Sequence, residues 1–332
     1  MEDGCRERVF QTAESTQFLT DSQNTKACMF QSIGISVVLL AGALMGLWTP
    51  DIDRAAIEKK YATPTTQFAV IDGNRVHYQD SGPRDAPVLV LLHGFGSSLQ
   101  TWDTWANTLD KKYRVIRLDL PGFGLTGPTR TQQYADTDDV QALSDLVDHL
   151  GLQTFALIGH SMGGKIAWNF AATYPQRVKQ LVLMAPDGYA HPEDFGAKPY
   201  GTSPFIRAIQ YCLPKYLVQK SLEPALFDPS TLSEEALTRY YDMLRAPGVR
   251  QAIVERAYQT VNTDPIARLK KITAPTLLLW GEHDRMIPKD NALRYEKVLA
   301  HVQTIVLPKQ GHLIQEERPQ EGLDRLLGFL SL

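Results

Sequence analysis

The sequence has few cysteines, little net charge and no dense block of basic residues. Its three cysteines, Cys5, Cys28 and Cys212, are widely spaced and form no CxxC pair. The chain therefore encodes neither a disulfide framework nor a zinc site. The formal net charge is only −3 over 332 residues, which argues against nucleic acid as a partner. No internal repeat or low-complexity tract is visible. With 43% hydrophobic residues, the chain can bury a sizeable core.

One segment differs from an ordinary globular sequence. Residues 33–48, IGISVVLLAGALMGLW, carry no charge, and the uncharged stretch extends back to Ala27. About 22 residues of helix span about 33 Å, enough for a hydrocarbon core of about 30 Å. We therefore expect a single-pass membrane anchor over residues 27–48, with Trp48 at the membrane interface and the membrane as a partner.

Two other interpretations of this run stay open: a cleaved signal peptide with Ala41-Gly42-Ala43 as its site, or a buried helix of the globular part. Met29 is an alternative start, and basic residues on both sides leave the orientation open. Residues 1–26 are polar and aperiodic, which predicts a disordered tail. Residues 49–66 predict a juxtamembrane helix and linker, with Thr49 as the N-cap.

From about residue 67 the pattern predicts an α/β domain. Residues 68–71 and 75–78 alternate around Asp72-Gly73-Asn74, which predicts a hairpin. Six short apolar runs predict further strands, at residues 88–92, 115–118, 155–158, 181–184, 276–280 and 304–307. Because these runs do not alternate, we expect a mostly parallel sheet with helices on both faces. The core is expected at residues 67–189 and 271–332, and a helical cap at 190–270.

The sharpest catalytic motif is GHSMG at residues 159–163, between a predicted strand and a helix that is expected to end near Tyr174. An abrupt strand-to-helix turn forces its central residue into a strained conformation, and the two glycines leave room for close packing. Ser161 is therefore the predicted nucleophile, at the carboxyl edge of the sheet.

A serine hydroxyl needs a base, and the base needs a carboxylate that orients it. His312 follows the last predicted strand in a glycine-containing loop and is the best placed of the eight histidines. Asp284 lies four residues past the strand 276–280 and is the predicted acid. Glu282 in the same loop and Asp187 after the strand 181–184 are its rivals. The chain order of nucleophile, acid and base matches that of G-x-S-x-G hydrolases.

Attack on a carbonyl develops an oxyanion that needs hydrogen-bond donors. HGFG at residues 93–96 follows the first core strand, and its glycines let backbone N–H groups turn toward a pocket. We expect the donors to be the backbone N–H groups of Phe95 and Met162. His93 is expected to brace this loop rather than to titrate in catalysis.

Four motifs occur in order: HGFG at 93–96, DLPGFGLT at 119–126, GHSMGG at 159–164, and WGEHD at 280–284 with GH at 311–312. On these motifs the chain from about Gln67 to its end resembles the α/β-hydrolase superfamily. The resemblance implies an eight-stranded sheet, a variable lid after the sixth strand, no cofactor and no metal. The uncharged run and TPDIDRAAIEKKY are similar to bacterial membrane-anchored members, which implies the bacterial inner membrane.

Members that are dehalogenases or epoxide hydrolases carry Asp at the nucleophile position, so Ser161 disfavours both. The leading expectation is a carboxylesterase or lipase-like enzyme that cleaves a small-molecule ester through an acyl-enzyme on Ser161. The apolar cap points to a lipid-like acyl group. Alternatives are a carbon–carbon bond hydrolase or a perhydrolase-like enzyme with the same triad, and a non-catalytic protein that binds a ligand or partner through the cap. Oligomeric state and natural substrate are left open by the sequence.

Overall fold

The computed structural model describes residues 48–189 and 204–331. The chain divides into two units, Met1–Thr49 and Pro50–Leu332, and the fold below is that of the second unit. The predicted tail at residues 1–26, and the run at 27–48 apart from Trp48, lie outside the described residues. The domain boundaries expected from the sequence therefore stay predictions.

The expected membrane anchor is corrected. Across residues 48–189 and 204–331, no helix combines the length and the hydropathy that crossing a membrane requires. The uncharged run reached the necessary length only through residues 27–32, whereas its strongly apolar part is shorter than the roughly 20 residues of a spanning helix. The membrane as a partner and the inner-membrane location are withdrawn with the anchor.

Eight strands form one sheet in the order β1-β2-β4-β3-β5-β6-β7-β8. The predicted hairpin is confirmed, because β1 and β2 pair antiparallel around Asp72 and Gly73, whose φ angles are 48° and 73°. β2 is also antiparallel to β4, and all other pairs are parallel. The strands are β1 (Thr66–Ile71), β2 (Asn74–Ser81), β3 (Val88–Leu92), β4 (Arg114–Leu118), β5 (Phe155–His160), β6 (Val178–Met184), β7 (Thr276–Gly281) and β8 (Val302–Leu307). The predicted fold class is confirmed.

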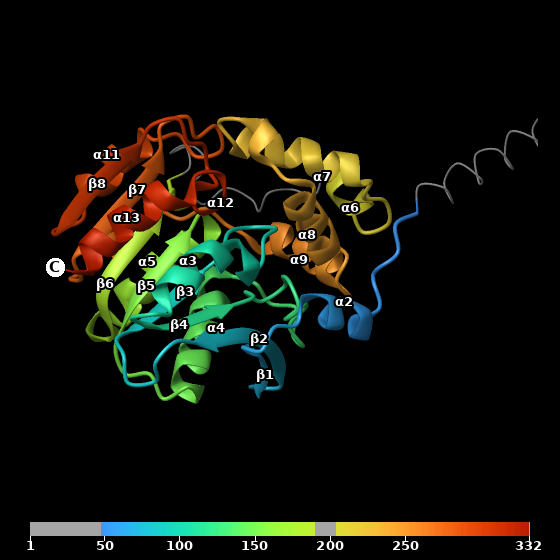
Figure 1. Cartoon of the computed structure of the whole chain (residues 1–332), viewed down its shortest axis with the longest axis horizontal. Helices are drawn as coiled ribbons and strands as arrows, with labels where there is room; N and C mark the ends of the chain where they lie inside the picture. The colour runs from blue at the N-terminus through green and yellow to red at the C-terminus, as the bar shows by residue number, and fades with distance from the viewer. Residues whose placement is uncertain (1–47, 190–203, 332) are drawn as a thin grey trace, which may run out of the picture. The chain divides into compact units, whose positions relative to one another are not determined.

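Helices cover both faces of this sheet (Figure 1). On β3, Val90 and Leu92 pack in the cluster that contains α4 and α5, whereas Leu89 and Leu91 pack in the cluster that contains α3 and α13. This period of two places apolar side chains on both faces. The helices around the sheet are α3 (Asp103–Leu109), α4 (Asp136–His149), α5 (Met162–Thr173), α11 (Asn291–Glu296), α12 (Ile314–Glu317) and α13 (Pro319–Leu330), with a 3₁₀ turn η1 (Leu99–Trp102).

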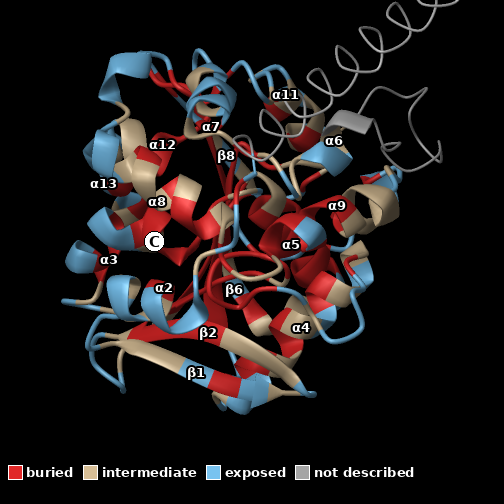
Figure 2. Ribbon diagram, turned by 90° about the vertical axis from the view of Figure 1, so that its right-hand side faces the viewer, coloured by how far each residue is buried: buried red, intermediate tan, exposed pale blue. Residues whose placement is uncertain are grey.

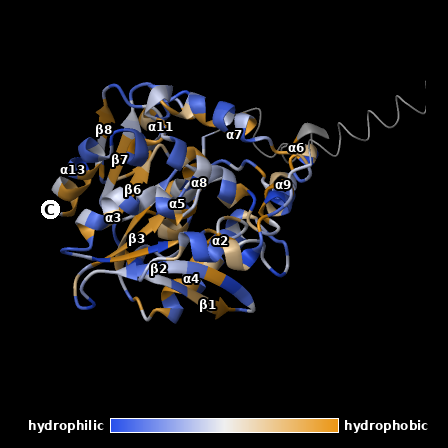
Figure 3. Cartoon of the chain, turned by 45° about the vertical axis from the view of Figure 1, so that its right-hand side comes forward, coloured by the Kyte–Doolittle hydropathy of each residue, from blue (hydrophilic) through white to orange (hydrophobic). Residues whose placement is uncertain are grey.

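Burial follows the same pattern. Figure 2 shows buried residues concentrated on the central strands, while β1 at the edge is mostly intermediate or exposed. The central strands are also the hydrophobic ones in Figure 3. The central strands are therefore fixed by packing on both faces, which makes their carboxyl ends a rigid platform for a site.

Between β6 and β7 the chain forms an insertion, of which the described part contains helices and no strand. Its helices are α6 (Pro204–Ala208), α7 (Lys215–Leu222), α8 (Glu234–Leu244), α9 (Val249–Gln259) and α10 (Ile266–Leu269). Arg256 on α9 forms a two-pronged ion pair with Asp139 on α4, at 2.6 and 2.9 Å, and both side chains are buried. This pair ties the insertion to the sheet-covering helices.

The predicted N-cap at Thr49 is wrong. Helix α2 (Arg54–Tyr61) begins later, and Asp53 caps it by accepting from the N–H of Ala56 at 3.0 Å. The carboxylate of Asp51 instead accepts from Arg250 of α9 at 2.6 Å and from the N–H of Gly248 at 2.9 Å. A tertiary contact therefore overrides the local capping signal.

Candidate active site

The residues singled out by the sequence lie at the carboxyl ends of parallel strands. Ser161 and Met162 follow β5, Phe95 follows β3, Asp284 follows β7 and His312 follows β8. The parallel register pairs the last residues of neighbouring strands, such as those of β5 with those of β6. These side chains therefore converge on one edge of the sheet, where open α/β sheets bind ligands.

Ser161 has a strained backbone, with φ 54° and ψ −118°. Its N–H donates to the carbonyl of Met184 at 2.9 Å, and its carbonyl accepts from the N–H groups of Lys165 and Asp187 at 3.0 Å. A Cβ on Gly159 would lie 2.3 Å from the carbonyl oxygen of Gly163, so this close turn requires glycine. Such a conformation costs about 1–3 kcal/mol and persists only where the surroundings enforce it.

His312 and Asp284 are joined by a hydrogen bond of 2.7 Å between Nδ1 and Oδ2. Both side chains are buried. The other carboxylate oxygen of Asp284 accepts from the N–H groups of Met286 and Ile287 at 2.8 and 2.9 Å. A carboxylate that accepts these bonds is held in place, and it draws the imidazole proton to Nδ1. Nε2 of the neutral ring is then left as a proton acceptor.

Neither of the two rival carboxylates forms a hydrogen bond or ion pair with His312. Glu282 is exposed and lies 3.5 Å from His283. The main chain of Asp187 is held through its N–H, which donates to the carbonyl of Ser161, and its own carbonyl, which accepts from the indole of Trp168 at 2.9 Å. Of the three candidate carboxylates, the structure therefore places that of Asp284 against His312.

His160, the residue before Ser161, links the serine and histidine loops. Its Nε2 and the carbonyl oxygen of His312 are 2.9 Å apart, and the two imidazole rings are 4.6 Å apart. Burial lowers the pKa of His160 well below the usual value, so the ring is neutral. The only signal for this role in the sequence was the position next to Ser161. Between Ser161 and His312 themselves the structure has no hydrogen bond, and such bonds often tighten only with substrate.

The HGFG loop lies against the nucleophile turn. A Cβ on Gly94 would lie 3.2 Å from Cβ of Ser161. The predicted bracing role of His93 is confirmed: Nδ1 binds the carbonyl of Gly94 at 2.7 Å, and Nε2 accepts from the N–H of Leu120 at 3.0 Å. Burial lowers the pKa of His93, which keeps it neutral.

The expected oxyanion donors are the backbone N–H groups of Phe95 and Met162, and neither has a backbone acceptor among the described residues. Met162 is the first residue of α5, so its N–H has no acceptor within the helix. Within residues 48–189 and 204–331, no backbone carbonyl accepts from the N–H of Phe95.

Across the same residues, no group of three or more His, Cys, Asp or Glu side chains is arranged to hold a metal ion.

A family model and individual relatives both match this sequence. Residues 87–319 match the family model of the α/β hydrolase fold. An uncharacterized hydrolase YugF of Bacillus subtilis is 31% identical over 274 residues, which cover 81% of this chain and 98% of the relative. A 2-hydroxy-6-oxononadienedioate/2-hydroxy-6-oxononatrienedioate hydrolase of Burkholderia vietnamiensis is 32% identical over 287 residues, covering 82% and 98%.

Solved structures share the same architecture. The crystal structure of a membrane phospholipase A, described as a bacterial virulence factor, superposes with a TM-score of 0.65 at 25% identity. That match covers 91% of this chain and 96% of the other. The sheet topology, the strained serine turn and the matched family model together show that this chain is a hydrolase-type enzyme and belongs to the α/β-hydrolase family.

Proposed function

We propose that this chain hydrolyses a carbon–carbon bond in a 2-hydroxy-6-oxo-dienoate, with Ser161 as nucleophile, His312 as base and Asp284 as the orienting acid. The observation that carries the proposal is the set of relatives named as hydrolases of such substrates, matched at about one third identity over nearly their whole length. This function replaces ester cleavage, the leading expectation from the sequence, because the named relatives favour its alternative.

The site can supply the chemistry that this cleavage requires. The 2-enol of the substrate first becomes a ketone by moving its proton to carbon 5. Ser161 then attacks the carbonyl at carbon 6 while His312 takes the hydroxyl proton. The bond between carbons 5 and 6 then breaks, and its electron pair delocalises onto the oxygen at carbon 2. This oxygen takes the proton that His312 holds, which returns the base to its neutral form. The backbone N–H groups of Phe95 and Met162 are the proposed donors to the oxyanion at carbon 6.

The acyl-enzyme on Ser161 is then hydrolysed by water that His312 activates. From 2-hydroxy-6-oxononadienedioate the balance gives 2-hydroxypenta-2,4-dienoate and succinate, with one water consumed. Because the conjugated system is shortened, loss of the substrate's absorption reports the reaction directly.

A second candidate is hydrolysis of a carboxylic ester, which needs the same nucleophile, base and donors but no ketone intermediate. It is supported by the likeness to the membrane phospholipase A over 91% of this chain. The specific observation in its favour is the length of that match, because the structure of a meta-cleavage product hydrolase covers only 80% of this chain.

A substrate panel separates the two candidates. The full chain is assayed with 2-hydroxy-6-oxononadienedioate and with p-nitrophenyl esters from acetate to palmitate. The proposal predicts a kcat/KM for the dienoate at least about 100-fold above that for any ester. The reverse ranking would assign the enzyme to ester hydrolysis, and no turnover of either class would favour a binding role.

A further inference from the structure

The loop of His312 is held by the insertion through main-chain hydrogen bonds. We call residues 223–228 the clasp segment; it consists of the 3₁₀ turn η4 (Glu223–Ala225) and the three residues after it. The carbonyl of Ala225 accepts from the N–H of His312 at 2.7 Å and from that of Leu313 at 3.2 Å. The proposed base thus takes one of its positional restraints from outside the sheet domain.

The clasp segment and the histidine loop are in direct backbone contact. A Cβ on Gly311 would lie 2.6 Å from the carbonyl oxygen of Ala225 and 2.7 Å from the nitrogen of Phe227. No side chain fits between the two backbones. Movement of the clasp segment therefore moves the residue next to His312.

Two charged side chains outside the insertion, Arg285 and Glu317, form hydrogen bonds that stabilise this contact. Arg285, the residue after Asp284, donates from Nη2 to the carbonyl of Leu226 at 2.5 Å and to that of Glu223 at 3.4 Å. Glu317 accepts with Oε1 from the N–H of Asp228 at 2.8 Å and with Oε2 from the N–H of Gly311 at 2.7 Å. Hydrogen bonds in which one partner is charged are the stronger kind.

His312 is consequently fixed at three points. Asp284 holds its ring through Nδ1, His160 holds its carbonyl, and Ala225 of the clasp segment holds its N–H. A displacement of about 1 Å in a catalytic group can cost about 10²-fold in rate. The third restraint exists only while the clasp segment is seated on the core.

We propose that Arg285 and Glu317 are positioning residues for His312, acting through the clasp segment, so that the base is aligned only while the insertion is docked. The proposal rests on the proposed function in one respect, the role of His312 as base, and is independent of the natural substrate.

The test uses the rate at which a fluorophosphonate probe labels Ser161 in the full chain, because labelling needs an activated serine but no natural substrate. Glu317→Ala and Arg285→Met are each expected to lower the labelling rate constant about tenfold. Whichever substrate the wild type turns over should show the same fall in kcat, with its KM changed less than about twofold.

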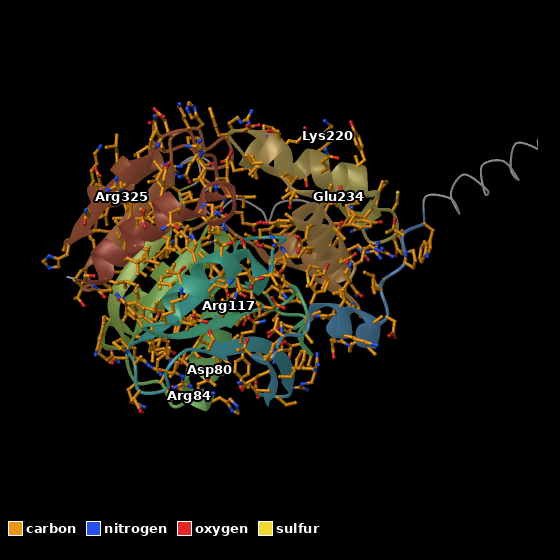
Figure 4. The ribbon with its side chains drawn as sticks, in the orientation of Figure 1. Asp80, Arg84, Arg117, Lys220, Glu234 and Arg325 are labelled. Atoms are coloured by element: carbon orange, nitrogen blue, oxygen red, sulfur yellow. The ribbon has the colours of Figure 1, made fainter. Side chains whose placement is uncertain are left out.

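Two substitutions serve as matched controls. Lys220 of α7 binds both carboxylate oxygens of Glu223 at 2.9 and 3.0 Å, so Lys220→Met removes a cation that contacts the clasp segment without touching the histidine loop. Arg325 is an exposed residue of α13, and Figure 4 shows both side chains. Both Lys220→Met and Arg325→Met should label at the wild-type rate.

A spectroscopic readout separates misalignment from loss of fold. The hydrogen-bonded Nδ1 proton of His312, assigned by its absence in His312→Ala, should broaden or shift in Glu317→Ala and Arg285→Met at unchanged melting temperature. Arg285→Lys, which keeps one donor, should recover part of the rate. If Glu317→Ala does not fold, Arg285→Met at its exposed position still decides the matter.

Wild-type labelling rates in both variants would overturn the positioning role while leaving the proposed function intact. Failure of the wild type itself to label at Ser161 would instead overturn the proposed function, and the positioning role with it.

Discussion

His160 and His312 are joined by a hydrogen bond of 2.9 Å from a ring nitrogen of the first to the main-chain carbonyl of the second. Because a carbonyl oxygen only accepts, Nε2 of His160 carries the proton, and Nδ1 is the acceptor that faces Nε2 of Gln315 at 3.4 Å. The neighbour of the proposed nucleophile therefore fixes the backbone of the proposed base. Its lowered pKa, caused by burial, keeps it in the neutral form that this arrangement requires.

His160→Phe tests this relationship. The change keeps a flat ring of similar size but removes the donor to His312, so kcat should fall about tenfold while KM stays within about twofold. His160→Gln retains an N–H donor and should recover most of the rate. Equal kcat values in the wild type and His160→Phe would show that the bond does not align the base.

The buried histidines also predict how stability depends on pH. Burial lowers the pKa of both His93 and His160, so below about pH 6.5 the unfolded chain binds protons that the folded chain does not. The free energy of unfolding should therefore fall as the pH drops from about 6.5, by up to about 1.4 kcal/mol per pH unit for each histidine. Urea unfolding at about pH 7.5, 6.5 and 5.5 measures this slope. His160→Gln should reduce it by about one proton, and an unchanged slope would contradict the assignment.

Substitution of each carboxylate identifies the acid. Asp284→Asn should lower kcat by about 10⁴, because an amide no longer holds the Nδ1 proton of His312. Asp187→Asn is the matched control and should stay within about threefold of the wild type. Steady-state kinetics on one substrate decides between them, and the opposite ranking would move the role to Asp187.

The ion pair of Arg256 with Asp139 predicts a stability effect without a catalytic one. Arg256→Met leaves a buried carboxylate unpaired and should lower the free energy of unfolding by about 3–5 kcal/mol. Adding Asp139→Leu removes the stranded charge and should restore a large part of the loss. Urea titration of the single and double variants measures both effects, and a double variant no more stable than Arg256→Met would show that charge burial is not the cause.

The sheet was predictable because its strands are short apolar runs, and β3 begins and ends at the predicted residues. β6 begins three residues before the predicted residue 181, since Lys179 and Gln180 near its start are polar and interrupted the apolar signal. The helix cap at Thr49 failed for a different reason: the contact of Asp51 with Arg250 joins residues 199 positions apart, which local capping rules do not contain.

The residues of the candidate site that lie in recognisable sequence motifs could be predicted. Each motif names a residue by its place after a strand, which was sufficient to choose Ser161, Asp284 and His312. The contacts of His160 and of the clasp segment were not predictable, because their partners are main-chain carbonyls 152 and 87 positions away (312 minus 225) that leave no residue-type signal. The membrane anchor expected over residues 27–48 was wrong because the strongly apolar part of this run, residues 33–48, is shorter than the roughly 20 residues of a spanning helix.

The most direct test of the account is the turnover of 2-hydroxy-6-oxononadienedioate by the wild type and by Ser161→Ala, followed by loss of substrate absorption and by identification of the products. The account predicts succinate and 2-hydroxypenta-2,4-dienoate from the wild type, with kcat at least about 10³-fold lower in Ser161→Ala. A wild type that leaves the dienoate intact, or a Ser161→Ala variant that cleaves it at the wild-type rate, would contradict the proposed function.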